Sequence, residues 1–310
     1  MILWRSAARS ELAGGATTSP TPTEPAAEGV IAPERAAARR RRFPLGSVLI
    51  VILALGLAAL GFLYECRTSR LQALVAHRFA SRLTFKVERG KSASIVLPGG
   101  PADDRLGYAR LGDFEQSLSE RSYRISRQAS FTPPLVLIAR AGINPPYTEK
   151  NSAGLRLLDR HGEVLFDGTS TRHHFKSYED IPDPIVPALL FIENRELFTD
   201  RFPYRNPAVE WDRLAYVAML YGQKAAGFGG DVQGGSTLAT QIEKYRHSAA
   251  GLTTSPEEKL RQIASGTLRA YRNGIDTRGE RRQIVLNYLN TVPLSAVAGF
   301  GEVNGLGEAM

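Results

Sequence analysis

The chain has 310 residues, 43% of them hydrophobic and 23% charged, with a formal net charge of +8. This length and apolar content suffice for a membrane anchor and two modest folded domains, and they exclude a chain that is disordered throughout. The positive charge suits an anionic partner, which could be nucleic acid, anionic lipid or a phosphorylated substrate. Cys66, the single cysteine, excludes an intrachain disulfide, and the five histidines lack the spacing of metal ligands, so no metal site is predicted.

Residues 1–42 are rich in Ala, Pro, Thr, Glu and Arg and show no apolar periodicity. Such a composition predicts a disordered tail, which we place in the cytoplasm. The tail ends in four arginines, residues 39–42, directly before an apolar segment. At that place arginines set membrane topology and contact anionic headgroups more simply than they bind nucleic acid, so nucleic acid is not expected as a partner.

Residues 43–64, FPLGSVLIVILALGLAALGFLY, carry no charge. At about 1.5 Å per residue they reach across the ~30 Å core of a bilayer and predict a transmembrane helix. A cleaved signal peptide is the alternative, but the segment is too long for a typical apolar h-region and begins deep in the chain. The arginines before it predict a cytoplasmic N-terminus, so everything after Tyr64 is expected on the outer side of the membrane.

Residues 65–154 predict a small α+β region. A short helix is expected over 67–82, followed by the strand candidates LTFKV, SIVLP, YRIS and LVLIAR, which are separated by Gly, Pro, Asp and Ser. A second domain is assigned to 155–310, and it opens with the segment LRLLDRHGEVLF. The alternating apolar residues of this segment predict a hairpin that turns at His161-Gly162.

From Ile181 onwards the apolar residues recur at helical spacing, which predicts five helices. The fourth begins with a capping box between Ser255 and Glu258, with Pro256 at the first helical position. In the second, the stripe that begins at Trp211 is expected to pack in the core, with contact to a membrane surface as the alternative. The five segments are residues 181–197, 207–223, 236–249, 255–272 and 277–290.

The segment QGGSTLATQIEK, residues 233–244, has the features of a phosphate site. Glycines let a backbone approach a ligand closely, and free N–H groups at a helix start attract anions. Ser236 is expected to cap the helix. A plain loop-to-helix cap is the alternative, because Gly-Gly-Ser-Thr also occurs in ordinary loops.

Four motifs follow one another at fixed spacing: Glu193-Asn194-Arg195 after the apolar run PALLFI, GGSTLATQ with Lys244 three residues on, EKLRQ over 258–262, and IVLNYLN ending at Asn290. In this order they resemble the peptidoglycan glycosyltransferase domain of glycosyltransferase family 51, found in class A penicillin-binding proteins and monofunctional transglycosylases. The resemblance covers roughly residues 155–310. It implies a mainly α, lysozyme-like helical domain, located on the periplasmic side of a bacterial inner membrane.

The resemblance also implies a reaction: lipid II is polymerised into glycan strands, and undecaprenyl pyrophosphate leaves. Glu193 matches the family's general base, which takes the proton of the attacking 4-hydroxyl, and it is expected at a half-buried helix face. Gln262 stands at the second catalytic position, where the family has glutamate. The implied substrate-binding residues are Asn194, Arg195, Gly234, Gly235, Ser236, Thr237, Gln241, Lys244, Arg246, Lys259 and Arg261, with a solvated helix face as the alternative for Arg246 and Arg261.

The chain departs from the family pattern at several positions. Asn194 replaces an aspartate, Thr240 a glutamine and Gln262 a glutamate, and a neutral amide is a poor ligand for magnesium or manganese. No cofactor is therefore expected to be required. The pattern continues beyond Met310 in the family, so the domain is expected to be incomplete at its C-terminal end.

These departures leave two alternatives to an active transferase. One is a non-catalytic module of the same fold that binds lipid II or partner synthases. The other is a lytic enzyme that cleaves glycans with one glutamate, which the basic residues disfavour because cleavage of an uncharged bond does not require them. The expected partners are lipid II, the growing glycan strand, the inner membrane and other cell-wall synthesis proteins.

Overall fold

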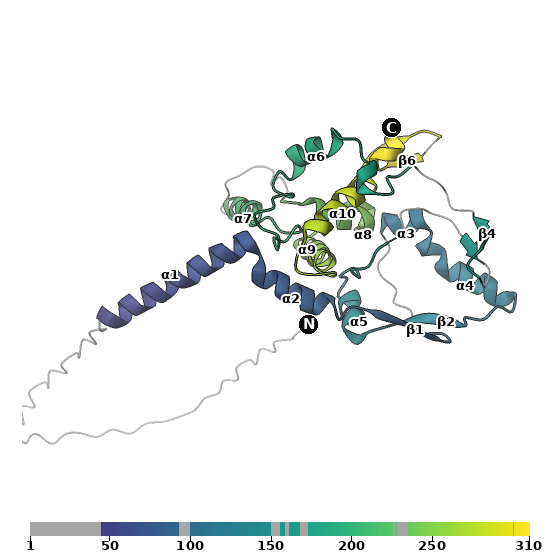
Figure 1. The fold of residues 1–310 in the computed structure, drawn as a ribbon, viewed down its shortest axis with the longest axis horizontal. Coiled ribbons are helices and arrows are strands. Elements are labelled where there is room, and N and C mark those ends of the chain that lie inside the picture. The colour runs from purple at the N-terminus through teal and green to yellow at the C-terminus, as the bar shows by residue number, and fades with distance from the viewer. Residues whose placement is uncertain are drawn as a thin grey trace, which may run out of the picture. The chain divides into compact units, whose positions relative to one another are not determined.

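The computed structural model describes residues 45–92, 100–149, 156–158, 161–167, 173–225, 227, 235–299 and 301–310. In these ranges the chain is mainly helical, with three separate two-stranded antiparallel sheets (Figure 1). The predicted fold class, mainly α with a small β content, is therefore confirmed. The predicted tail, residues 1–42, lies outside the described residues.

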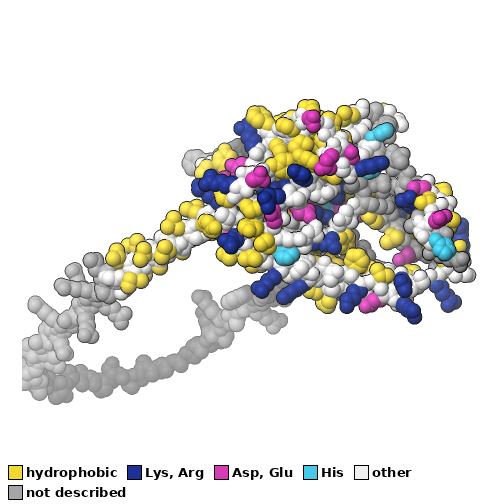
Figure 2. Space-filling model, in the orientation of Figure 1, with side chains coloured by type: hydrophobic (Ala, Val, Ile, Leu, Met, Phe, Trp, Pro, Cys, Tyr) yellow, Lys and Arg dark blue, Asp and Glu magenta, His cyan; other side chains and the backbone are white. Residues whose placement is uncertain are grey.

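The apolar segment forms a single helix, α1 (Leu45–Thr68). Residues Gly46–Thr68 are long and apolar enough to cross a membrane. Hydrophobic side chains cover this helix (Figure 2), and its leucines and isoleucines from Leu49 to Leu63 are exposed. The helix ends four residues later than the sequence pattern predicts, at Thr68.

The region after α1 contains four helices and one sheet among its described residues. Strands β1 (Phe85–Arg89) and β2 (Arg127–Phe131) pair antiparallel. Strand β1 overlaps the predicted LTFKV strand, and the predicted SIVLP strand lies outside the described residues. The helices are α2 (Arg70–Ala80), α3 (Pro101–Leu106), α4 (Leu111–Glu120) and α5 (Pro133–Arg140).

Two strand predictions in this region are wrong. The run LVLIAR belongs to helix α5, which Pro133 and Pro134 start at its first turn, because proline suits the N-terminal positions of a helix. A short apolar run cannot be assigned to strand or helix from periodicity alone. The segment YRIS, residues 123–126, is irregular and precedes strand β2 instead of forming it.

The predicted hairpin is confirmed as β3 (Arg156–Leu158) paired with β4 (Val164–Asp167). Gly162 lies at its turn with φ of +86°, a left-handed conformation that favours glycine. A third strand pair stands near the C-terminal end of the sequence, β5 (Pro293–Val297) with β6 (Gly301–Asn304), and the short helix α11 (Leu306–Ala309) follows it.

All five predicted helices are present. Helix α8 lies at the centre of the group, since it packs against α9, α10 and α3 (Figure 1). Its apolar residues Leu238 and Ile242 are buried together with Val285 of α10. The five helices are α6 (Ile185–Glu193), α7 (Trp211–Ala225), α8 (Leu238–His247), α9 (Pro256–Ala270) and α10 (Arg278–Leu289), and the single turns η1 (Tyr108–Arg110), η2 (Tyr178–Asp180) and η3 (Ala249–Gly251) lie between the longer elements.

Helix α9 begins where the sequence predicts. The Ser255 hydroxyl accepts a hydrogen bond from the Glu258 N–H at 3.1 Å, and Pro256 occupies the first helical position. The second hydrogen bond of the predicted capping box differs. The Glu258 carboxylate accepts from the N–H of Thr254, at 2.7 Å, and not from that of Ser255.

The expected burial of the α7 stripe is wrong for much of its length. Leu214 and Ala218 are exposed, while Trp211 and Val217 are half-buried. Val217 faces the residues before α8, where a Cβ on Gly235 would lie 3.3 Å from Val217 Cγ2. Trp211 instead packs edge-to-face on Phe62 of α1, with ring centroids 6.2 Å apart.

Candidate active site

Glu193 is the last residue of helix α6, which is otherwise built from apolar residues. Its carboxylate is half-buried, as expected, and its Oε2 accepts a hydrogen bond from Gln241 Nε2 at 2.9 Å. The next residue, Asn194, is buried at the helix end and donates its backbone N–H to the Leu190 carbonyl. The carboxylate is thus held at a helix terminus by a side chain of α8.

The start of α8 is fixed by two threonines. The Thr237 hydroxyl accepts from the Thr240 N–H at 3.3 Å, and the Thr240 hydroxyl accepts from the Thr237 N–H at 2.9 Å. These two bonds satisfy N–H groups that have no partner within the helix. The prediction that Ser236 caps the helix is therefore wrong by one residue. The Ser236 hydroxyl is left available for another contact.

That contact is with Lys259 of helix α9. The Lys259 ammonium donates to Ser236 Oγ at 2.7 Å and to Thr240 Oγ1 at 3.4 Å. Burial, together with the neighbouring positive charge of Lys244, lowers the pKa of Lys259 to about 8. A half-buried ammonium held by hydroxyl groups, with no carboxylate contact among the described residues, can bind an anion.

Helix α8 connects the carboxylate to this cation. Thr240 contacts Lys259, the next residue, Gln241, contacts Glu193, and Lys244 lies one turn further on. Thr240 and Gln241 are successive residues, so one helix contacts both the carboxylate and the Lys259 ammonium. The structure thus links Glu193 to Gln241 and Lys259 to Ser236, and Lys244 is near enough to Lys259 to lower its pKa.

Two tyrosines near Glu193 were not predicted from the sequence. Tyr245 donates its hydroxyl to Gln241 Oε1 at 3.3 Å, which leaves the amide nitrogen of Gln241 to face Glu193. Tyr288 of α10 lies beside Tyr245, and burial followed by the charges of Tyr245 and Glu193 raises the pKa of its hydroxyl. The spacing of four between Gln241 and Tyr245 on a helix could have indicated their contact.

Arg246 lies apart from this group, in a buried ionic cluster. Its guanidinium donates to Glu149 Oε2 at 2.9 Å and to Thr291 Oγ1. Glu149 also contacts His247 at 2.9 Å and Arg269 at 3.2 Å. Burial alone would raise the pKa of Glu149, but Arg269, His247 and Arg246 together hold it well below its usual range. Arg246 therefore fastens Glu149 to α8, and Arg269 fastens it to α9.

Gln262 is buried in a network of neutral groups. Its Nε2 donates to Ser248 Oγ at 2.9 Å and to Thr253 Oγ1 at 3.0 Å, and its Oε1 accepts from Thr253 at 3.2 Å. This amide holds the turn between α8 and α9. A neutral amide whose oxygen already accepts a hydrogen bond is a poor ligand for a divalent cation. In the described part of the chain, no group of three His, Cys, Asp or Glu side chains could hold a metal ion.

The remaining predicted residues are dispersed. Arg261 is exposed and lies beside Gly142, where a Cβ would approach its guanidinium to 3.3 Å. Gly235 is packed against α7, where a Cβ would make a tight contact with Val217. Gly234 lies outside the described residues.

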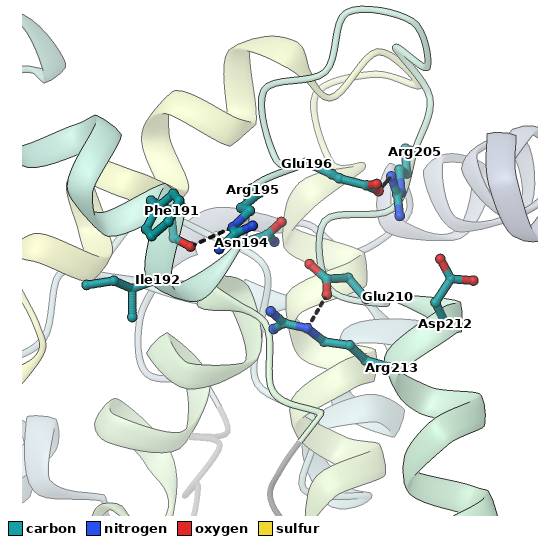
Figure 3. Close-up of a pocket in the computed structure, with 9 residues that line it drawn as sticks. All are labelled: Phe191, Ile192, Asn194, Arg195, Glu196, Arg205, Glu210, Asp212 and Arg213. Atoms are coloured by element: carbon teal, nitrogen blue, oxygen red, sulfur yellow. Dashed lines mark hydrogen bonds and ion pairs between the residues drawn. The ribbon is translucent and has the colours of Figure 1, made fainter.

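Asn194 and Arg195 line a cavity of about 400 Å³ between the end of α6 and the start of α7 (Figure 3). Arg195 lies over the Phe191 ring, with its guanidinium carbon 4.1 Å from the ring centroid. On the opposite wall Glu210 accepts from Arg213 at 2.8 Å, and burial raises the pKa of Glu210. The cavity is lined by Phe191, Ile192, Asn194, Arg195, Glu196, Arg205, Glu210, Asp212 and Arg213.

Comparison with known proteins identifies the region that carries this geometry. Residues 161–310 match the family model described as transglycosylase. The match contains Glu193, Gln241, Lys244 and Lys259, whereas Glu149 precedes it. No curated protein and no solved structure matched the chain.

Proposed function

We propose, because residues 161–310 belong to the transglycosylase family, that this protein polymerises lipid II into glycan strands and releases undecaprenyl pyrophosphate. Glu193 acts as the base that removes the proton from the attacking sugar hydroxyl. Lys259 and Lys244 neutralise the charge that develops on the departing pyrophosphate, and the hydroxyl groups of Ser236 and Thr240 orient the Lys259 ammonium.

One observation carries this proposal: successive residues of α8 contact the carboxylate and the cation. Thr240 reaches Lys259 and Gln241 reaches Glu193. The reaction needs proton removal at one reacting atom and charge neutralisation at another, held in a fixed relation. The contacts of Thr240 and Gln241 supply this relation.

Helix α1 supports the location of the reaction. Its composition suits a single membrane span, and a lipid-linked substrate is reached most directly by an enzyme anchored in the same bilayer. We propose a bacterial inner-membrane protein with a cytoplasmic N-terminus and the transferase domain in the periplasm. The arginines at 39–42 support this orientation.

The test is the conversion of labelled lipid II by the full chain in membranes. Wild type is expected to make glycan, and Glu193→Gln is expected to lower its rate by about 10²- to 10⁴-fold, the range for loss of a general base. Glu179→Gln is the matched control, because it removes one exposed carboxylate from the same domain. Equal rates for wild type and Glu193→Gln would refute the role of Glu193.

A second candidate is a lipid II-binding module without turnover. It is favoured by Gln262, whose amide is fully engaged by Ser248 and Thr253 where the family has a second glutamate. Retention of labelled lipid II by wild type, without any polymer, would decide for this candidate. Degradation of purified sacculi without added lipid II would instead indicate a lytic enzyme.

A further inference from the structure

Helix α2 (Arg70–Ala80) has one face that packs on the folded domain. Ala73 and Ala80 are buried on it, and helix α2 contacts α9 along this side. The His77 side chain also contacts the domain, with its Nδ1 at 2.8 Å from the carbonyl oxygen of Tyr271. These contacts fix which side of α2 faces away from the domain.

The side that faces away is apolar. Leu71, Leu74, Val75 and Phe79 are 64%, 47%, 69% and 36% exposed, and the last three lie three, four and eight positions after Leu71, on a single stripe. A surface helix of a soluble domain buries its apolar stripe and exposes its polar one. We refer to these four residues as the outer face of α2. Its exposure indicates a partner that is itself apolar.

The outer face directly follows the proposed membrane span. Between α1 and α2 stands Ser69, in a left-handed conformation with φ of +53°. The Glu65 carboxylate accepts hydrogen bonds from the N–H groups of Leu71, at 3.0 Å, and Gln72, at 2.8 Å. The span and α2 are therefore joined by a bend with defined hydrogen bonds, located where α1 ends.

Positive charges accompany the outer face. Arg78 is exposed among its four apolar residues, Arg70 is exposed at its edge, and Arg67 lies at the end of α1. An amphipathic helix with apolar residues flanked by arginine lies in the interface of a bilayer, where each basic residue is attracted by anionic headgroups. The charge pattern and the continuity with α1 thus both favour a bilayer surface as the partner of the outer face.

We propose that the outer face of α2 lies in the headgroup region of the bilayer that α1 spans and binds anionic phospholipid. This inference rests on the proposed membrane anchoring of α1. Because α2 is packed against α9, which carries Lys259, the contact fixes the orientation of the candidate active site above the membrane.

Reporter labels test the position of α2 in the full chain. In a Cys66→Ser background, which removes the native thiol, an environment-sensitive fluorophore is attached at Val75→Cys. The protein is reconstituted in vesicles of brominated phosphatidylcholine and phosphatidylglycerol. Leu57→Cys in the span and Ser119→Cys on exposed α4 are the comparison positions. The label at Val75→Cys is expected to be quenched about fivefold more strongly than that at Ser119→Cys.

The comparison positions separate the proposed position of α2 from the proposed membrane anchoring of α1. Quenching at Leu57→Cys without quenching at Val75→Cys overturns the inference and leaves the anchor intact, whereas loss of quenching at both positions overturns both. An unquenched label at Val75→Cys, together with disulfide-linked dimers of the unlabelled Val75→Cys variant, overturns it in favour of a second copy of the chain. Arg70→Gln combined with Arg78→Gln is expected to reduce the quenching at Val75→Cys when phosphatidylglycerol is present, and unchanged quenching contradicts the role of charge.

Discussion

The Gln241 side chain joins Tyr245 to Glu193, since its oxygen accepts from the tyrosine hydroxyl at 3.3 Å and its nitrogen donates to the carboxylate at 2.9 Å. An amide can present either its donor or its acceptor to a neighbour. The tyrosine hydroxyl selects the orientation in which the donor meets the carboxylate. Tyr245 is therefore a positioning residue for the proposed base.

Tyr245→Phe is expected to lower kcat about five- to tenfold and to leave KM nearly unchanged, because one neutral hydrogen bond contributes ~1 kcal/mol. The measurement is steady-state polymerisation of lipid II. Tyr216→Phe serves as control, because it removes a tyrosine hydroxyl at an exposed position of another helix, α7. A change in KM alone would contradict a role through Glu193.

Lys259 gives the proposed reaction a dependence on pH. Its pKa of about 8 means that the ammonium loses its proton above that pH, when it no longer neutralises a phosphate. We expect kcat/KM to fall above pH 8 by about tenfold per unit until a second cation limits the loss. Lys259→Arg should abolish this decline, because a guanidinium stays protonated. A pH–rate profile with the same decline in Lys259→Arg would assign it to another group.

Gln262→Ala separates a structural from a catalytic role. Loss of the amide leaves the hydroxyl groups of Ser248 and Thr253 without their buried partner, which is expected to cost about 1–3 kcal/mol of unfolding free energy. Urea unfolding measures this cost. If Gln262 is structural, Gln262→Asn should lower stability in the same direction and reduce kcat by less than about tenfold. A larger loss of kcat at unchanged stability would place Gln262 in the chemistry.

The ionic cluster around Glu149 is expected to make stability depend on pH. Burial opposes protonation of His247, but its hydrogen bond to Glu149 raises the pKa of His247 above 6.5. Because the folded state binds this proton more tightly, its contribution is complete below pH 6.5 and is lost as pH rises through the folded-state pKa. Wild type should lose more stability between pH 6 and pH 9 than His247→Gln, with exposed His173→Gln as control. Equal losses of stability in wild type, His247→Gln and His173→Gln would exclude His247 as the cause of this pH dependence.

Removal of the carboxylate tests the same cluster directly. Glu149→Gln leaves Arg246 and Arg269 without their shared partner and is expected to lower the unfolding free energy by about 3–5 kcal/mol. Chemical denaturation of the full chain checks this value. Glu115→Gln is the control, because the partner of this carboxylate, Lys91, is exposed. It should change the unfolding free energy by less than about 1 kcal/mol.

The sequence predicted the elements better than their contacts. Helical spacing located α6 to α10, and Ser255 located the start of α9, because these signals are local. Ser236 was assigned the cap that Thr237 provides, since both hydroxyl residues suit the position and only the structure shows which one the chain places there. The run LVLIAR was assigned to a strand because a short apolar segment fits either period.

The same difference between local signals and long-range contacts applies to the candidate site. Motif order predicts Glu193, Gln241, Lys244 and Lys259, and in the structure each of them belongs to α8 or is contacted by it. Arg246 was expected among them because it follows Lys244 closely. Its carboxylate partner stands 97 residues earlier in the chain, a distance over which residue type alone gives no pairing information.

The attachment of Glu149 to α8 and α9 has a practical consequence for any shortened form of this protein. A polypeptide cut at the start of the family match, residue 161, would keep Arg246, His247 and Arg269 but lack the anion that they surround. Glu243 would then be the carboxylate left beside Arg269 and His247, and Arg246 would lose its ion pair with Glu149. A shortened form meant to test the proposed activity should therefore begin before residue 149.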